Sequence, residues 1–289
     1  MKLSNATCYY YEFSAEECVK HFAASGWDCI ELSTEHSEEL LLRGGDPAKT
    51  GREFLRHASD TGVAIPQAHL SLQIDITDDD DGHVTDELKR WLDMYLGMGI
   101  KSAVLHPGGH RYGRAHPEMT LAELQERRLR ALRILTEHIK GSDLSICLEN
   151  VGYCGSCEAL NAIIDPIGDK NLGICLDTGH LNLSFHRTGR FGETYRQAHF
   201  IRTAGQRLRA LHIHDNDGTG DQHLMPYTHG NIDFREVMTA LREIGCEHPL
   251  NLEIPGESRD LGTDTPYPVA VRCAKSKYLF ELFDILQKI

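Results

Sequence analysis

Short apolar runs recur along the chain, and each ends in or beside a histidine, aspartate or glutamate. The run at 208–216 reads LRALHIHDN, and the segments AHLS, VLHPG, ICLEN, ICLDTGH and LNLEIPGE have the same form. Parallel strands that are covered on both faces are nearly continuous apolar runs, because neither face alternates with solvent. The pattern therefore predicts buried parallel strands whose ends carry the chemistry of the protein.

Eight strand-like segments alternate with helix-like segments. The expected strands are 7–11, 27–32, 63–70, 102–105, 144–148, 172–176, the run at 208–216, and 249–252. The expected helices are one from a capping box at Ser14 and Glu17 to about Gly26, then 47–62, 86–98, 117–140, a shorter one ending at Gly168, 191–208, one opening near Asp233, and 268–286. Such long crossovers are required between parallel strands, which do not pair through tight turns.

The alternation predicts a (β/α)8 TIM barrel. Such barrels typically run to about 250 residues, so the whole chain, residues 1–289, is expected to form one domain. An open, doubly wound α/β sheet is the second choice. It is disfavoured because no glycine-rich phosphate-binding motif follows the first predicted strand. In a barrel, the strand ends would meet at the C-terminal face, where reacting groups are found.

Charge and composition favour a small-molecule partner. The formal net charge is −13, and residues 78–81 form an acidic cluster, so the phosphates of a nucleic acid would be repelled. No stretch approaches the roughly 18 apolar residues of a membrane span, and the N-terminus has no secretory apolar run. The nine scattered cysteines are typical of reduced thiols. We therefore expect a cytoplasmic protein that binds neither membrane nor nucleic acid; the oligomeric state, a homo-oligomer included, is left open.

Carboxylates and imidazoles concentrate at or just past the predicted strand ends. They are His69, His106, Glu149, Asp177, His180, His214, Asp221, His223 and Glu253. Any one of these histidines alone would more often be a hydrogen-bonded structural residue. Together they would repel one another unless cations were present, so a metal site is the economical interpretation. His212 lies on the same strand face as His214 but one step deeper, which suits a supporting or packing role.

Two further groups of residues carry weaker signals. Arg111, Arg114, Arg187 and Arg190 lie in loops after the fourth and sixth strands and are candidates to bind a phosphate or carboxylate on the substrate, although surface arginines are common. Cys154 and Cys157 have the spacing of a redox or zinc motif, but no second cysteine pair lies near them. An accidental placement at a loop or helix start is the favoured interpretation of this pair.

With these motifs the chain resembles the xylose isomerase-like barrel superfamily, in which sugar isomerases and epimerases share a fold with the endonuclease IV family. In the sugar epimerases one divalent metal is held by Glu, Asp, His and Glu from strands five to eight. The resemblance implies that Glu149 in LEN, Asp177 in LDTGH, His214 in HIHDN and Glu253 in LEIPGE hold that ion. In endonuclease IV a three-metal cluster uses further residues, and the matching positions here are His69 in AHLS, His106 in LHPGG, His180 in DTGH, and Asp221 and His223 in DQH.

The chain departs from both patterns. The segment after His214 lacks the lysine and serine of the endonuclease pattern, and the loop after strand three is acidic where a DNA backbone would be met. Epimerases of free ketoses commonly have a second Glu six residues after the first and an Arg six residues after the metal-binding His, but Gly155 and Gly220 stand at those positions. The resemblance therefore implies the reaction class more firmly than the substrate.

The expected function is that of a divalent-metal-dependent isomerase or epimerase of a sugar or sugar phosphate. One Zn²⁺, Mn²⁺, Mg²⁺ or Co²⁺ ion, or up to three, would stabilise an enediolate while Glu149 and Glu253 carry the proton. His106, His180 and Arg187 would bind the substrate. An endonuclease IV-like multi-zinc phosphodiesterase is the alternative, and a metal-dependent binding protein without catalysis is a third hypothesis.

Overall fold

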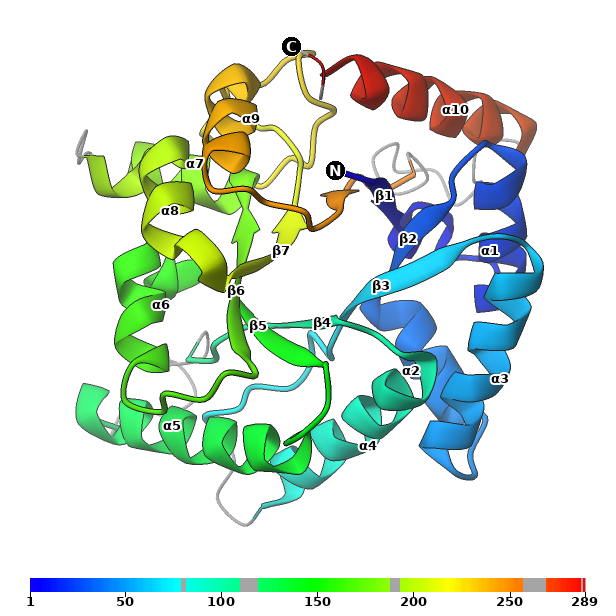
Figure 1. The fold of residues 1–289 in the computed structure, drawn as a ribbon. Coiled ribbons are helices and arrows are strands. Elements are labelled where there is room, and N and C mark those ends of the chain that lie inside the picture. The colour runs from blue at the N-terminus through cyan, green and yellow to red at the C-terminus, as the bar shows by residue number, and fades with distance from the viewer. Residues whose placement is uncertain (79–81, 110–118, 188–192, 257–268, 287, 289) are drawn as a thin grey trace.

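Eight parallel strands form a ring at the centre of the computed structural model, with helices around it (Figure 1). The structure describes residues 1–78, 82–109, 119–187, 193–256, 269–286 and 288. The strands are β1 (Leu3–Ala6), β2 (Cys29–Leu32), β3 (Ala64–His69), β4 (Ser102–Leu105), β5 (Ser145–Glu149), β6 (Leu172–Asp177), β7 (Leu208–His212) and β8 (Leu250–Leu252). They are ordered β7-β6-β5-β4-β3-β2-β1-β8. An isolated parallel bridge between Ile213 and Leu252 joins β7 to β8, so the fold is the predicted (β/α)8 barrel.

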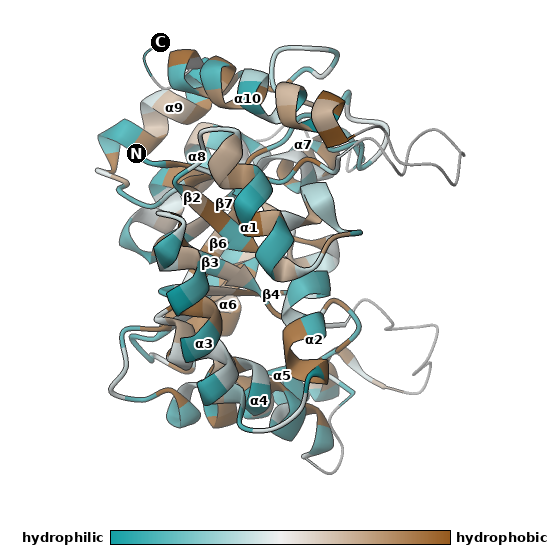
Figure 2. Ribbon diagram, turned by 90° about the vertical axis from the view of Figure 1, so that its right-hand side faces the viewer, coloured by the Kyte–Doolittle hydropathy of each residue, from teal (hydrophilic) through white to brown (hydrophobic). Residues whose placement is uncertain are grey.

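The helices cover the outside of the strand ring. They are α1 (Ala15–Ala24), α2 (Thr34–Leu42), α3 (Pro47–Asp60), α4 (His83–Met98), α5 (Leu121–His138), α6 (Cys157–Ile164), α7 (Thr178–Arg187), α8 (Gln197–Ala204), α9 (Phe234–Glu243) and α10 (Val269–Leu286). Hydrophobic and hydrophilic residues both occur along the helices (Figure 2), and the buried apolar residues of the core come from helices and strands alike. The main core therefore lies between ring and helices, and a small cluster of Val104, Cys147, Cys175 and Ala210 forms a second one.

Local helix signals in the sequence are confirmed where a capping side chain was available. Ser14 accepts from the Glu17 backbone N–H while the Glu17 side chain accepts from the Ser14 N–H, which is the predicted capping box. Asp233 caps α9 by accepting from two backbone N–H groups of its first turn. These caps satisfy N–H groups that have no partner inside the helix, so the helix starts are fixed locally.

The first predicted strand, 7–11, is wrong. The strand is β1, Leu3–Ala6, and Thr7–Tyr10 forms a 3-10 turn after it. The aromatic run looked like a strand because Tyr9 and Tyr10 are fully buried, but they pack on each other and on Phe22 of α1. The true strand escaped notice because two of its four residues, Ser4 and Asn5, are buried although they are polar.

The predicted helix 191–208 is also wrong in extent. Residues 188–192 lie outside the described part of the chain, a 3-10 turn covers Glu193–Tyr195, and α8 ends at Ala204, after which β7 already begins at Leu208. Two helices, α2 and α7, were not predicted. Each begins within two residues of the end of its strand, with no loop-like composition to separate strand from helix.

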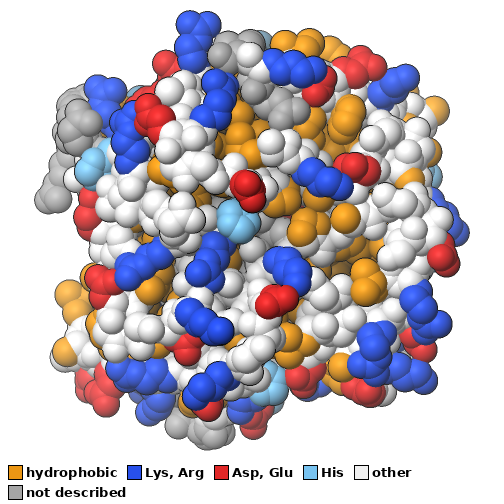
Figure 3. Space-filling model, in the orientation of Figure 1, with side chains coloured by type: hydrophobic (Ala, Val, Ile, Leu, Met, Phe, Trp, Pro, Cys, Tyr) orange, Lys and Arg blue, Asp and Glu red, His pale blue; other side chains and the backbone are white. Residues whose placement is uncertain are grey.

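The described residues show how charged side chains are distributed on one face and where the cysteines lie. On the face seen in Figure 3, basic and acidic side chains are interspersed, so its described residues form no continuous basic surface. All nine cysteines are free thiols, and both Cys154 and Cys157 are buried, at a 3-10 turn and at the first residue of α6. None of the helices in the described ranges combines the length and apolarity needed to cross a membrane.

Two glycines set the spacing of the α3–α4 helix pair. A Cβ atom at Gly97 of α4 would lie 2.2 Å from the backbone oxygen of Ala48, and one at Gly51 of α3 would lie 2.1 Å from that of Met94. Atoms cannot approach so closely, and backbone cannot swing aside as a side chain can. We therefore expect Gly97→Ala to lower the free energy of unfolding by about 1–3 kcal/mol, the usual cost of overpacking.

The measurement is urea unfolding of Gly97→Ala beside Gly220→Ala. Gly220 lies in a loop where the nearest atom to a new Cβ is 3.9 Å away, and its backbone is not in the left-handed region. The control should unfold like the parent. Equal midpoints for all three proteins would contradict the close helix contact.

Candidate metal centre

Four strands end in residues that face one another at the mouth of the barrel. His69 is the last residue of β3, Glu149 of β5, Asp177 of β6 and His212 of β7. The strand register pairs Glu149 with Cys175 and Asp177 with His212, so neighbouring strands end at nearly the same height. His106 and Glu253 follow immediately after β4 and β8, and His214 lies two residues beyond the end of β7. The fold thus gathers the predicted side chains at the C-terminal face, where barrel enzymes carry their active sites.

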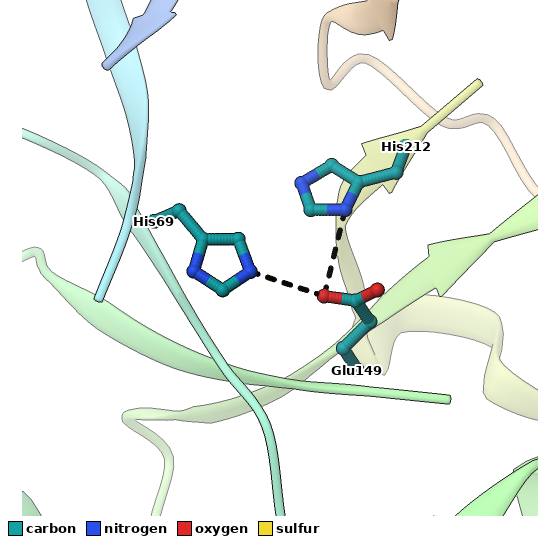
Figure 4. Close-up of side chains that lie close together, drawn as sticks. All are labelled: His69, Glu149 and His212. Atoms are coloured by element: carbon teal, nitrogen blue, oxygen red, sulfur yellow. Dashed lines mark hydrogen bonds and ion pairs between the residues drawn. The ribbon is translucent and has the colours of Figure 1, made fainter. Parts of the chain in front are cut away.

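Glu149 is the hub of this cluster and is 1% exposed. Its Oε2 lies 3.3 Å from His69 Nε2 and 3.5 Å from His212 Nδ1, as drawn in Figure 4. The same oxygen is 3.4 Å from His106 Nε2, and Oε1 is 2.9 Å from His180 Nδ1. One buried carboxylate therefore meets four imidazoles that come from four different segments of the chain.

His212 Nδ1 lies among three carboxylates. Besides the Glu149 contact, it is 3.4 Å from Glu253 Oε2 and 3.9 Å from Asp177 Oδ2. This nitrogen is buried and makes no hydrogen bond within the described part of the chain. The sequence analysis gave His212 a supporting role, whereas its position places it at the centre of the acidic groups.

His214 lies on the other side of Asp177. Its Nε2 is 2.9 Å from Asp177 Oδ2, and its ring stacks on His223 with centroids 3.9 Å apart. Gly179 of α7 makes room for this ring, because a Cβ there would lie 2.0 Å from His214 Cε1. The glycine of the DTGH segment is thus required by close packing against an imidazole.

A third group lies at the rim of the cluster. Asp221 Oδ2 is 3.3 Å from His180 Nε2 and 3.4 Å from His223 Nε2. His223 donates its Nδ1–H to the Glu253 carbonyl oxygen at 2.7 Å, which leaves Nε2 to face Asp221. The His223 backbone has φ +47°, a left-handed conformation that costs energy for a residue with a side chain and is often found at functional sites.

The electrostatic environment lowers the pKa of the two buried carboxylates, Glu149 and Asp177, and raises that of His212. Burial alone would raise the pKa of Glu149, but the positive potential of His212 and His106 lowers it well below its ordinary value. In the same way, burial is outweighed at Asp177 by His180 and His214, and its pKa falls to about 2. Burial would lower the pKa of His212, but the nearby thiol and carboxylates raise it well above the usual range. Glu149 and Asp177 are therefore ionised at neutral pH and require positive charge beside them.

The imidazole hydrogen bonds fit a metal site. His69 donates Nδ1–H to the Leu70 carbonyl oxygen at 2.7 Å, so its Nε2 faces Glu149, and His223 is arranged likewise toward Asp221. A nitrogen lone pair that points at a carboxylate is repelled unless a proton or a metal ion lies between them. Ligand atoms around one ion held at about 2.0–2.2 Å are separated by roughly 3–3.5 Å, which matches the contacts seen here. The donor set of imidazole and carboxylate suits Zn²⁺, Mn²⁺ or Co²⁺.

Four groups of three described residues bring their ligand atoms within 4.8 Å of one another. These groups are His69, Glu149 and His212; Asp177, His212 and Glu253; Glu149, Asp177 and His180; and His214, His223 and Glu253. Every predicted histidine and carboxylate is therefore part of the cluster or in contact with it. The predicted ligand set of Glu149, Asp177, His214 and Glu253 stays a prediction.

Of the four predicted arginines, only Arg187 lies within the described residues. Arg187 is exposed at the C-terminal end of α7, and its role in substrate binding stays a prediction. Arg111, Arg114 and Arg190 lie outside the described residues, as do 79–81 of the acidic loop.

Sequence analysis missed Glu31 of β2, which is 1% exposed and contacts His212 Nε2 at 3.2 Å. One signal was available, because Glu31 is the single charge within the apolar run CIEL. Such a charge in a buried strand needs a partner.

A cavity of about 190 Å³ opens beside the cluster. Its lining residues are Cys8, Glu31, Ser33, Thr34, Glu35, His69, Leu72, His223, Glu253 and Pro255. Three of the cluster residues, His69, His223 and Glu253, thus reach a space that a small molecule can enter. Polar side chains from the cluster and apolar groups both line this cavity, a mixture that is usual for small-molecule sites.

Sequence comparison finds several relatives. The chain is 31% identical over 158 residues to an uncharacterised protein of Methanocaldococcus jannaschii, 31% over 126 residues to a D-psicose 3-epimerase of Enterocloster bolteae, and 26% over 141 residues to a probable endonuclease 4 of Metamycoplasma arthritidis. The matched segments cover 52%, 42% and 47% of this chain. They span 49%, 37% and 48% of the relatives, so the chain matches about half the length of these proteins or less.

Comparison of structures shows the same fold over nearly the whole chain. A D-psicose 3-epimerase from Clostridium cellulolyticum, solved with D-tagatose, has a TM-score of 0.79 with 16% sequence identity, over 99% of both chains. The sequence profile of the xylose isomerase-like TIM barrel family matches residues 19–277. The chain therefore belongs to the xylose isomerase-like TIM barrel family, as its motifs had indicated.

Proposed function

We propose that the chain is a divalent-metal-dependent epimerase or isomerase of a monosaccharide or its phosphate. The observation that carries this proposal is that Glu149, Asp177 and Glu253, at the ends of β5, β6 and β8, converge on the buried Nδ1 of His212, the last residue of β7, beside a small cavity. The similarity to sugar epimerases in sequence and fold supports the same reaction class.

In this proposal the four ligands are Glu149, Asp177, His212 and Glu253. His212 takes the place of His214, which the sequence predicts, because His212 Nδ1 is within 3.5 Å of both glutamates. When bound there, a divalent ion supplies Lewis acidity, which stabilises the negative charge that develops on substrate oxygens as a neighbouring C–H proton leaves.

The two glutamates are the proposed proton carriers. Glu253 lines the cavity, so its carboxylate can reach a substrate carbon directly. Glu149 lies deeper, beneath the imidazoles of His106 and His180, which suit the binding of substrate hydroxyls. Removal of a proton by one carboxylate and return by the other to the opposite face gives epimerisation, and return to the adjacent carbon gives isomerisation.

One observation favours a second function, a multi-metal phosphodiester hydrolase. His69 and His106 join Glu149 on one side of the cluster, and His180, Asp221 and His223 form a group on the other. Up to three ions could be held by these sets, which is more than a proton transfer needs. The net charge of −13 opposes a polyanionic substrate, so this function ranks second.

The first prediction concerns the two glutamates. Glu149→Gln and Glu253→Gln should each reduce solvent exchange of the substrate C–H proton at least 100-fold, because each removes a ligand and a proton carrier. The measurement is NMR of D-psicose or D-tagatose in D₂O with the Mn²⁺- or Co²⁺-loaded protein. Glu158→Gln on α6, an exposed carboxylate paired with His199, is the control and should exchange like the parent. Both glutamine variants within tenfold of the parent would rule out this assignment.

The second prediction separates the histidines. His212→Ala should weaken binding of the tightest ion by 10–100-fold or more, whereas His223→Ala should leave that ion bound, because His223 belongs to the rim group. The measurement is metal content by mass spectrometry after dialysis against a weak chelator. One ion per chain in the parent supports the epimerase, and three favour the hydrolase. Equal loss of all metal from both variants would show one cooperative cluster instead.

A third prediction concerns nucleic acid. The protein loaded with Zn²⁺ should neither bind duplex DNA in a salt-dependent manner nor cleave it at an abasic site, because the overall charge repels phosphates. Gel shift and incision assays on a fluorescent abasic duplex test this, with the chelator-treated protein as the control. Incision that depends on metal and turns over repeatedly would move the hydrolase to first place.

A further inference from the structure

The inner wall of the barrel holds a buried carboxylate below the metal cluster. Glu31 lies on β2, is 1% exposed, and both its oxygens lie 3.2 Å from His212 Nε2. An ionised group cut off from water is costly unless it is fully hydrogen-bonded, and an apolar residue of similar size would fill the same volume without that cost. The groups that Glu31 contacts should therefore show what its carboxylate does.

Two buried amides turn their NH₂ groups toward Glu31. Gln67 Nε2 donates to Glu31 Oε2 at 2.5 Å, and Asn251 Nδ2 donates to the same oxygen. The other ends of these amides, Gln67 Oε1 and Asn251 Oδ1, have no hydrogen-bond partner within the described residues. Leaving a buried acceptor without a partner costs about 1–3 kcal/mol. Both amides thus direct their N–H groups at the carboxylate and leave their oxygens without a partner, although Gln67 Nε2 also donates to the Leu211 carbonyl oxygen at 3.2 Å.

The remaining acceptor capacity of Glu31 is directed at His212. A carboxylate that faces Nε2 fixes the ring proton on that nitrogen, because only the N–H form can be donated. The lone pair of Nδ1 is then left to face Glu149 and Glu253, at 3.5 and 3.4 Å. The ring orientation is fixed by the same hydrogen bond, since rotation of the imidazole would break it and leave Glu31 with its two amide donors alone.

From these contacts we infer that Glu31 is a positioning residue for the metal site: its carboxylate holds the Nε2–H of His212 and presents Nδ1 as the ligand atom. This inference rests on the proposed metal site of Glu149, Asp177, His212 and Glu253. Hydrogen-bonded partners of this kind orient metal-ligating histidines and increase their basicity, and their loss typically reduces metal affinity by 10–100-fold.

The experiment measures Zn²⁺ affinity by competition with a chromophoric chelator in the parent, Glu31→Ala and Glu31→Gln. Glu31→Ala should bind the tightest ion 10–100-fold more weakly. Glu31→Gln keeps an oxygen that accepts from His212, and the unpartnered oxygens of Gln67 and Asn251 can turn to accept its amide protons, so its loss should be smaller than that of Glu31→Ala. Glu137→Gln, which removes one exposed charge on α5, is the control for net charge and should match the parent.

A second readout reports the ligand atom itself. In ¹¹³Cd²⁺-loaded protein labelled with ¹⁵N-histidine, the His212 signal, assigned by its absence in His212→Asn, should show coupling of cadmium to Nδ1 and a proton on Nε2. Cadmium bound through Nε2 of His212 in the parent would overturn the inference, even if Glu31→Ala does not fold.

The outcomes distinguish the inference from the proposed function. A parent that binds no divalent ion contradicts the proposed function itself. A parent that binds zinc while Glu31→Ala binds it within twofold contradicts only the positioning role. A raised KM with unchanged zinc affinity in the Glu31 variants would assign the carboxylate to direct substrate contact, and this too would overturn the inference.

Discussion

The organising constraint in this structure is the enclosure of negative charge at the mouth of the barrel. Glu149 and Asp177 are almost fully buried, and each is surrounded by imidazoles instead of water. Buried carboxylates of one sign repel each other over short distances in a medium of low polarity, so they coexist only if positive charge is interleaved with them. The histidines that reach Glu149 come from β3, β7 and α7 and from the residue that follows β4. The strand ends and loops around the barrel mouth are therefore arranged so that imidazoles lie beside the negative charges of Glu149 and Asp177.

The sequence predicted the barrel and the membership of the cluster well, because both depend on local and repetitive features. A strand in a closed parallel barrel is buried on both faces, so its apolar run and the polar residue that ends it are visible without knowledge of the partners. The caps at Ser14 and Asp233 are likewise decided within a few residues. The prediction was wrong where burial is polar, as at Ser4 and Asn5 of β1, because a buried polar strand has the composition of a loop.

The arrangement inside the cluster could not be predicted in the same way. The sequence placed His212 and His214 on one strand face, but β7 ends at His212, and only its register beside β6 shows that His212 lies among Glu149, Asp177 and Glu253. The partnership of Glu31 with His212 joins residues 181 positions apart and depends on the curvature of the closed ring. Single residues in a sequence do not carry this information, because it arises when the strands are brought into register.

The barrel is closed at one seam, where β7 and β8 meet through the isolated bridge of Ile213 and Leu252. His212 immediately precedes this bridge on one side, and Glu253 immediately follows it on the other. Their facing atoms, His212 Nδ1 and Glu253 Oε2, are 3.4 Å apart across the seam. An ion bound by both side chains would hold β7 and β8 together. Binding of the ion would then stabilise the closed barrel, and closure of the barrel would strengthen binding of the ion. Loss of the ion would then loosen the contact between β7 and β8.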